Sequence, residues 1–326
     1  ITMFNLSITA CSFFLQKSNS KAGKNIFELN QPIVFPTENG GEEKVSALEL
    51  FDLFFQQYQE MKKDEDRQKS FHCDISSIKD FETNEYRVKY VRVLSGIYGS
   101  SSEILDGKSQ KIKFRKTASD IETRPFYVFV VIPKDNERVT VQKGMLIFQN
   151  VGPYGIKTIT TEYMKAFFSS YFSITIKCRT IAPDLFVKKV VKAENIKKIH
   201  IVRNNKSADG SDDLYIGYGT EVRELRNIRF NTPAGNKIME KIQWFIGAKS
   251  RLFEFENRDY STVKLTVDIG GRDRIIDLHN LEKLSIIEAI PDDIRMADGH
   301  PNETQLVEHL HSVISEYLSE MVLRIS

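Results

Sequence analysis

Apolar and polar residues alternate at the start of the chain, where Phe4, Leu6, Ile8 and Ala10 are separated by Asn, Ser and Thr residues. A period of two residues predicts a β-strand with one buried face. More strands are predicted where β-branched and aromatic residues cluster between turn residues. They cover residues 85–98, 126–132, 144–149, 173–181, 199–203, 263–267 and 274–278.

Three segments carry apolar residues at helical spacing. Ser46 and Glu49 have the spacing of a capping box, and a long helix is predicted over residues 46–69. A second helix is predicted over residues 160–171. The third is an amphipathic C-terminal helix over residues 302–323, whose first residue is an Asn suited to cap it.

The length of 326 residues is large for a single hydrophobic core, so two domains are expected. We predict an α+β protein built mostly from antiparallel β-sheet. Residues 1–158 are expected to form a β-rich domain with one long helix. Residues 159–326 are expected to form a mixed α+β basic domain that ends in an acidic helix. A central insertion at about residues 160–250 within a discontinuous outer domain is the alternative layout.

Charge is spread unevenly along a chain whose net charge is +2. From Lys165 to Lys206 there are ten Lys and Arg residues against two carboxylates, which gives +8. From Glu282 to the C-terminus three cations stand against nine carboxylates, which gives −6. A basic stretch on a nearly neutral chain is typical of a surface that binds a polyanion, most commonly nucleic acid.

The candidate nucleic-acid contacts of this stretch lie on a short helix predicted after Pro183 and on the strand that follows. Lys188 and Lys192 are four residues apart, so a bound anion would relieve their repulsion in a helix. No row of aromatic residues alternates with the cations, which favours backbone contacts to double-stranded DNA over stacking on single strands. A solvated basic face is the alternative. The candidates are Lys188, Lys189, Lys192, Lys197, Lys198, Arg203 and Lys206.

A second basic segment follows Asp106-Gly107, a dipeptide that predicts a two-residue hairpin turn. Lys111, Lys113 and Arg115 alternate with apolar residues on the outgoing arm. On a strand this places three cations on one face, about 6.6 Å apart, similar to the phosphate repeat along one DNA strand. An edge strand protected by charges gives the same pattern.

The chain contains none of the common nucleotide-binding, hydrolase or zinc-protease motifs, so no catalytic residue, cofactor or metal ligand is predicted. Asp184, Glu194 and Lys197 resemble the motif of restriction-type nucleases. Two residues separate Glu194 from Lys197 instead of one, which on a strand places the two side chains on opposite faces. A metal-dependent nuclease effector remains an alternative hypothesis.

Compartment and assembly are indicated by two further patterns. Three widely spaced cysteines favour a reducing, cytoplasmic compartment, and no apolar run is long enough to predict a transmembrane helix. Leu306, Leu310, Val313, Tyr317 and Met321 approximate a heptad seam. This stripe predicts either a homodimer seam or a helix docked on its own core.

The order of elements over residues 140–323 resembles that of the RexA-like phage-exclusion proteins. The likeness rests on a strand pair at 143–157, the polar turn at 270–273 and Asn302-Glu303-Thr304 at the start of the last helix. It implies a cytoplasmic homodimer that binds double-stranded DNA without sequence preference and signals to a membrane or effector partner. A non-catalytic role in phage defence or exclusion is therefore the first hypothesis. An interaction subunit that binds no nucleic acid is another.

Overall fold

The computed structural model describes most of the chain, and its described residues belong to two compact units. One unit, here called the outer unit, comprises Ile1–Ile181 and Ser285–Ser326, and the inserted unit comprises Ala182–Leu284. The described residues are 4–21, 23–36, 41–134, 141–152, 154–179, 181, 196–206, 221–229, 240–242, 244, 253–255, 258–260, 262–269, 272–278 and 286–321.

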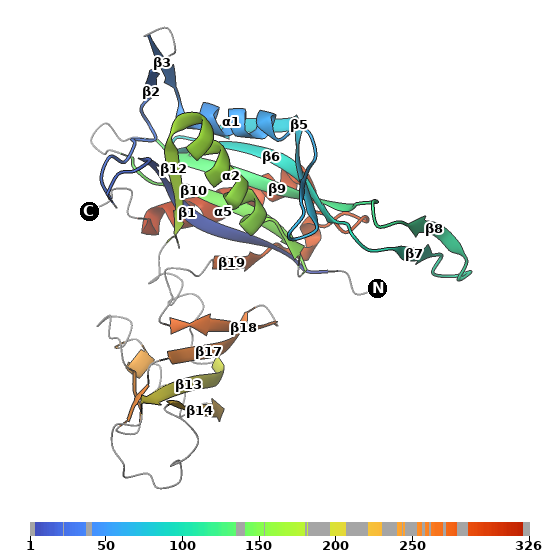
Figure 1. Ribbon diagram of the computed structural model, residues 1–326, viewed down its shortest axis with the longest axis vertical. Helices are drawn as coiled ribbons and strands as arrows, with labels where there is room; N and C mark the ends of the chain where they lie inside the picture. The colour runs from blue at the N-terminus through green and yellow to red at the C-terminus, as the bar shows by residue number, and fades with distance from the viewer. Residues whose placement is uncertain are drawn as a thin grey trace. The chain divides into compact units, whose positions relative to one another are not determined.

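An antiparallel sheet forms the centre of the outer unit (Figure 1). Each described pairing in it is antiparallel, in line with the predicted mixed α+β class dominated by antiparallel sheet. β11 (Tyr154–Gly155) pairs with β10, and β19 (Ile286–Ala289) pairs with β1. The main strand order is β12 (Ile174–Arg179), β1 (Leu6–Lys17), β10 (Gly144–Val151), β9 (Glu122–Pro133), β6 (Tyr86–Ile97), β5 (Lys69–Glu82) and β4 (Lys62–Asp64).

Helices cover both faces of this sheet (Figure 1). α1 (Ala47–Gln57) and α2 (Lys157–Phe172) lie on one face, where the Phe51 ring of α1 is 5.2 Å from the Phe13 ring of β1. α5 (Glu303–Glu320) lies on the opposite face, preceded by the short 3-10 helix η3 (Asp292–Ile294). The alternation in β1 predicted one buried face, but nearly the whole strand is buried because both faces are covered.

The apolar stripe of α5 is part of the core. Leu306, Leu310 and Tyr317 are fully buried, and Val313 and Met321 are nearly so. The Asn302 side chain accepts a hydrogen bond from the Gln305 N–H, which confirms the predicted cap. The stripe therefore serves the core of its own unit, which confirms the predicted alternative of a helix docked on its own core and excludes this stripe as a homodimer seam. Among the described helices, none is long and apolar enough to cross a membrane.

The first helix is shorter than predicted. Its capping box is confirmed, because the Glu49 N–H donates to Ser46 Oγ at 3.2 Å and the Ser46 N–H donates to a Glu49 carboxylate oxygen at 2.6 Å. α1 nevertheless ends at Gln57, and the predicted continuation to Lys69 is wrong. The charged segment that follows has no apolar stripe to pack, and it forms β4, which pairs with β5.

Two hairpins lie outside the main sheet. β2 (Ile33–Pro36) pairs with β3 (Glu42–Val45), and β7 (Ser102–Leu105) pairs with β8 (Ile112–Lys116). The β7–β8 hairpin extends away from the outer unit (Figure 1). Its predicted two-residue turn is wrong: residues 106–111 connect the strands. Asp106 explains the longer loop, since its carboxylate accepts hydrogen bonds from the two N–H groups at residues 108 and 109.

The compact units do not divide the chain at the predicted boundary. Ile159 lies within α2 and is buried, and β12 continues the same unit by pairing with β1. The predicted blocks 1–158 and 159–326 therefore differ from the observed units. The units follow the alternative layout in outline, with Ala182–Leu284 in place of residues 160–250.

The inserted unit contains a four-stranded antiparallel sheet and a two-stranded one. Its core includes Ile199, Ile201, Val263 and Leu265, all of which are buried. The predicted strands and hairpin in this region are confirmed. The larger sheet has the order β14 (Glu221–Arg229), β13 (Ile196–Lys206), β17 (Thr262–Ile269) and β18 (Arg272–Asp277), and the smaller pairs β15 (Phe253–Phe255) with β16 (Arg258–Tyr260).

Candidate functional site

The cations predicted on the β7–β8 hairpin are mostly neutralised by its own carboxylates. Lys113 Nζ lies 2.7 Å from a carboxylate oxygen of Asp106, and Arg115 Nε lies 3.1 Å from one of Glu103. Lys113 and the nearby backbone N–H groups hold the pKa of the Asp106 carboxyl well below its usual range. Lys111 belongs to the connection instead of β8. Lys113 and Arg115 therefore lie on β8 with carboxylate partners, and Lys111 lies directly before the strand.

The basic stretch of the inserted unit is only partly described. Lys197 and Lys198 lie on β13, and the pairing with β17 is irregular between Ile196 and Lys198. Lys198 is half-buried on the face opposite the core, and His200 on the same face pairs in register with Lys264 of β17. The candidates Lys188, Lys189 and Lys192 lie outside the described residues.

The remaining two candidates of that stretch lie farther along β13. Arg203 pairs in register with Glu224 of β14, and Lys206 pairs with Glu221. Cross-strand positions in an antiparallel pair are nearest neighbours on one face. The sequence of β14 thus places an acidic residue opposite each of these two cations, while Lys198 pairs with Arg229.

A hollow of about 600 Å³ in the outer unit brings other cations of the basic stretch together. It lies between α2 and β12, and we call it the α2–β12 hollow. Its cations are Lys165, Lys177 and Arg179, and no carboxylate is among its described lining residues. The other lining residues are Ala166, Ser169, Thr175, Ile176 and Cys178.

The local fold explains why these residues meet. Ser173 joins α2 directly to β12 in a left-handed conformation, with φ of 53°, so the chain reverses and the strand runs back beside the helix. On α2, Lys165, Ala166 and Ser169 follow helical spacing and share one side. β12 is at the end of the described strand order, so one of its edges borders the hollow instead of another strand.

The electrostatic environment of the hollow is positive. Within the described part of the chain, none of its three cations forms an ion pair with a carboxylate. Burial lowers the pKa of the Lys143 ammonium, and repulsion from Arg179 lowers it further. The Arg179 guanidinium lies 5.4 Å from the Phe14 ring centroid, which positions it over an aromatic face.

Cysteine residues add a nucleophilic group to the hollow. The pKa of Cys178 is lowered, mainly by a hydrogen bond from the Cys11 thiol and more weakly by Lys157 and Lys165, while burial opposes the shift. The same contact and burial raise the pKa of Cys11. Of the two thiols, only that of Cys178 belongs to a residue that lines the hollow.

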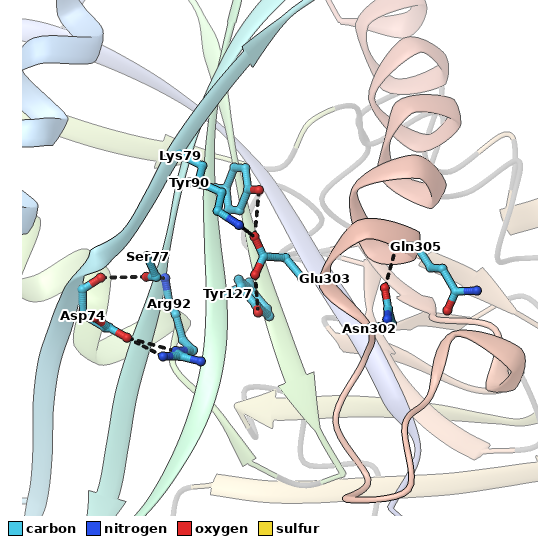
Figure 2. A network of polar contacts seen from close by, with 9 residues as sticks. All are labelled: Asp74, Ser77, Lys79, Tyr90, Arg92, Tyr127, Asn302, Glu303 and Gln305. Carbon is cyan, nitrogen blue, oxygen red and sulfur yellow. Dashed lines mark hydrogen bonds and ion pairs between the residues drawn. The ribbon is translucent and has the colours of Figure 1, made fainter.

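A different polar cluster joins α5 to the sheet on the other face. Figure 2 shows Lys79, Tyr90 and Tyr127 converging on the Glu303 carboxylate, at 2.6, 3.0 and 3.2 Å. Burial raises the pKa of Glu303, but these three donors outweigh it, so the net pKa is lowered. Burial and the same carboxylate raise the pKa of Tyr127 to about 12.

The neighbouring side chains in Figure 2 complete this cluster. Arg92 forms an ion pair with Asp74, and Ser77 donates to the Asp74 backbone carbonyl. Because donors and acceptors pair with each other, the cluster is best explained as a clamp that fixes the N-terminus of α5. Lys79 and Glu303 are 224 residues apart, so no local sequence signal predicted it.

Metal-site geometry is absent from the described residues: no group of three or more His, Cys, Asp or Glu side chains there is arranged to hold a metal ion. Asp184 and Glu194, which carry the nuclease-like pattern, lie outside the described residues.

The basic stretch of the sequence includes Lys165, Lys177 and Arg179, but its pattern did not single them out as contacts. Only the packing of α2 beside β12 shows that these three residues line one hollow.

Comparisons of this chain with protein-family models, with curated proteins and with solved structures find no match. The resemblance to RexA-like proteins therefore stays a prediction.

Proposed function

We propose that this protein binds double-stranded DNA through phosphate contacts, without sequence preference and without catalysing a reaction on it. The observation that carries this proposal is that Lys165, Lys177 and Arg179 line one hollow that has no carboxylate among its described lining residues. Cations from a helix and a strand form there a positive concave surface, which raises the local concentration of anions.

Each cation contributes differently to phosphate binding. The Lys ammonium groups act as mobile point charges, whereas the Arg179 guanidinium can donate two parallel hydrogen bonds to one phosphate. Mutual repulsion among nearby cations, as between Lys143 and Arg179, is relieved when an anion binds. Such contacts position a backbone and carry no base information, which supports binding without sequence preference.

The inserted unit supplies a second candidate contact surface. Its sequence has 19 Lys and Arg residues against 15 Asp and Glu residues, a net charge of +4. Lys198 and Lys264 lie on the less buried face of its sheet. The resemblance to RexA-like proteins is the ground for proposing that DNA binding serves phage exclusion or defence in the cytoplasm.

Fluorescence anisotropy with two duplexes of unrelated sequence tests the proposal. Log affinity should fall linearly with log salt concentration, with a slope of about −0.9 for each phosphate neutralised, and equally for both duplexes. Incubation of each duplex with Mg²⁺ or Mn²⁺ should leave it uncut. Absence of binding at low salt contradicts the proposal, and cleavage favours the nuclease alternative.

A protein-interaction role is favoured by one specific observation. Ile104, Leu105, Ile112 and Phe114 are 42–52% exposed on the projecting β7–β8 hairpin, an unusual number of apolar side chains for so short an element. The predicted homodimer requires a surface other than the buried α5 stripe, and this hairpin is the candidate.

Sedimentation distinguishes the interaction role. Ile104→Ser with Phe114→Ser should convert a self-associating protein into a monomer without unfolding it, because both side chains are exposed. A wild-type protein that is monomeric at high concentration contradicts the homodimer.

A further inference from the structure

The three cysteines differ sharply in their access to solvent. Cys11 and Cys73 are each only 1% exposed, whereas Cys178 is half-buried and lines the α2–β12 hollow. Of the three cysteines, Cys178 is therefore the one that a reagent in the hollow can approach, while the other two are covered by the folded core.

The position of Cys11 supports the reactivity of Cys178. Cys178 pairs in register with Phe13 of β1, so Cys11 is its diagonal neighbour on the same face of the sheet. The contact with the Cys11 thiol is the largest of the causes that lower the pKa of the Cys178 thiol. A lowered pKa favours the thiolate, which is the nucleophilic form of cysteine.

The surroundings of the sulfur favour an anionic reaction partner. Lys165, Lys177 and Arg179 line the same hollow. A volume of about 600 Å³ lies in the range of sites that hold small molecules. Lys177 and Arg179 alternate with Cys178 along β12, so their side chains leave the strand on the face opposite the sulfur. A small ligand with carboxylates can reach these cations across the edge of β12 while its reactive atom approaches Cys178.

We propose that Cys178 is a thiol-modification site that reacts with small anionic disulfides of the glutathione class. The Cys178 thiolate attacks one sulfur of the reagent and forms a mixed disulfide, while the sulfur–sulfur bond of the reagent breaks. The leaving thiolate takes the electron pair and is then protonated by water according to its own pKa. Cys178 is oxidised and half of the reagent is reduced, so no other oxidant is required.

The modification also has a consequence that rests on the proposed function. A glutathionyl group attached to Cys178 would bring two carboxylates into a hollow whose described lining residues include three cations and no carboxylate. These carboxylates would compete with DNA phosphates for the same side chains. Modification of Cys178 therefore lowers the affinity of the protein for double-stranded DNA.

Reaction kinetics with two reagents test the site independently of DNA. The dianion 5,5′-dithiobis(2-nitrobenzoate) and the neutral 4,4′-dithiodipyridine both report released thiol by absorbance. Replacing Lys165, Lys177 and Arg179 with Gln should slow the anionic reagent about tenfold more than the neutral one, because only the anion is concentrated by the hollow. Equal slowing of both reagents overturns the role of the cations.

Three cysteine variants identify the reacting residue and its partner. Cys178→Ser should abolish the fast phase, whereas Cys73→Ser should leave it unchanged. Cys11→Ala should slow it about threefold or more because the variant has no hydrogen-bond donor there, and Cys11→Ser should restore the rate because its hydroxyl also donates. A fast phase that survives in Cys178→Ser overturns the proposal.

Glutathione disulfide is the decisive reagent. Intact-mass and peptide mass spectrometry should show one glutathione per chain, on Cys178. Modification on Cys11 or Cys73, or none in the folded protein, overturns the inference. If Cys178 is modified but DNA affinity does not change, the modification site stands and the hollow is excluded as the DNA-binding surface. Mass spectrometry thus tests the modification of Cys178, and the DNA affinity of the modified protein separately tests whether the hollow binds DNA.

Discussion

The β7–β8 hairpin and the α2–β12 hollow carry comparable numbers of cations but differ in what surrounds them. On the hairpin, Lys113 and Arg115 each have a carboxylate of the same hairpin within 3.1 Å. In the hollow, Lys165, Lys177 and Arg179 form no ion pair with a carboxylate of the described residues. Whether a surface attracts a polyanion therefore depends more on the carboxylates beside its cations than on the number of cations.

Elementary electrostatics supports this contrast. An exposed ion pair contributes little to stability, about 0–1 kcal/mol. Its carboxylate does cancel most of the potential of its cation at distances larger than the separation of the two charges, and salt screens what remains beyond about 8 Å at physiological ionic strength. Cations without such partners retain their field in a concave surface, where the low-dielectric walls focus it. The hairpin instead presents an almost neutral, apolar arm.

The largest expected effect is a loss of stability in the core that supports α2 and, with it, the hollow. Phe168 of α2 is fully buried, and its ring centroid lies 5.2 Å from that of Phe51. Phe168→Ala should lower the free energy of unfolding by about 3–5 kcal/mol because it leaves a cavity. Urea denaturation measures this. The control Tyr171→Ala, which truncates a mostly exposed ring whose centroid lies 5.0 Å from that of Phe167, should lower the free energy of unfolding by only about 1 kcal/mol or less.

The second prediction concerns a substitution that adds a carboxylate to the hollow, where the hairpin already has carboxylates beside its cations. Ala166 lines the hollow and is exposed, so Ala166→Glu should place a carboxylate beside the three cations without removing any of them. Affinity for a duplex should fall about tenfold, because the cations are then neutralised from within the protein. Ala118→Glu near the hairpin makes the same change in net charge and should have little effect. An equal reduction of duplex affinity in the two variants would contradict the proposal that the effect arises in the hollow.

Backbone strain gives a third prediction. Ser173, which turns the chain from α2 into β12, has φ of 53°. A left-handed conformation costs an L-residue about 1–2 kcal/mol, and glycine avoids this at an entropic cost of about 0.5–1 kcal/mol. Ser173→Gly should therefore raise the free energy of unfolding by about 0.5–1 kcal/mol, as measured by urea denaturation. Ser173→Ala keeps the strain and should show no gain.

The smallest effect is expected on the hairpin. Glu103→Gln with Asp106→Asn removes the two carboxylates that pair with Arg115 and Lys113. The freed cations should raise duplex affinity about threefold in an anisotropy titration. The control Glu43→Gln with Glu42→Asn removes two exposed carboxylates from the other hairpin, at β3. A rise of the same size in the control would show that net charge alone is responsible.

The sequence predicted features whose causes are local. The capping box at Ser46, the cap at Asn302 and the continuous apolar strand β9 depend on neighbours within a few residues, and each is confirmed. The length of α1 was overestimated because charged residues at helical spacing do not reveal that the segment pairs with a later strand. The turn after β7 was wrong because Asp106 accepts backbone hydrogen bonds that stabilise a longer loop.

The candidate site depended on contacts that the sequence does not encode locally. Cys11 and Cys178 are separated by most of the outer unit's chain, and only the pairing of β1 with β12 makes them neighbours. The pairing of Arg115 with Glu103 depends on the hairpin register, which the predicted turn placed differently. The charge pattern therefore identified the basic stretch, but it did not identify Lys165, Lys177 and Arg179 as the residues that line one hollow.

The role of the hollow in DNA binding can be measured through the salt dependence of duplex affinity in two variants studied in parallel. One replaces Lys165, Lys177 and Arg179 with Gln, and the other replaces Lys113 and Arg115 with Gln. We expect the slope of log affinity against log salt to become shallower in the hollow variant, by about 0.9 for each phosphate that the variant no longer neutralises. The hairpin variant should keep the wild-type slope. A shallower slope in the hairpin variant, with the wild-type slope in the hollow variant, would show that DNA binds at the hairpin and not at the hollow.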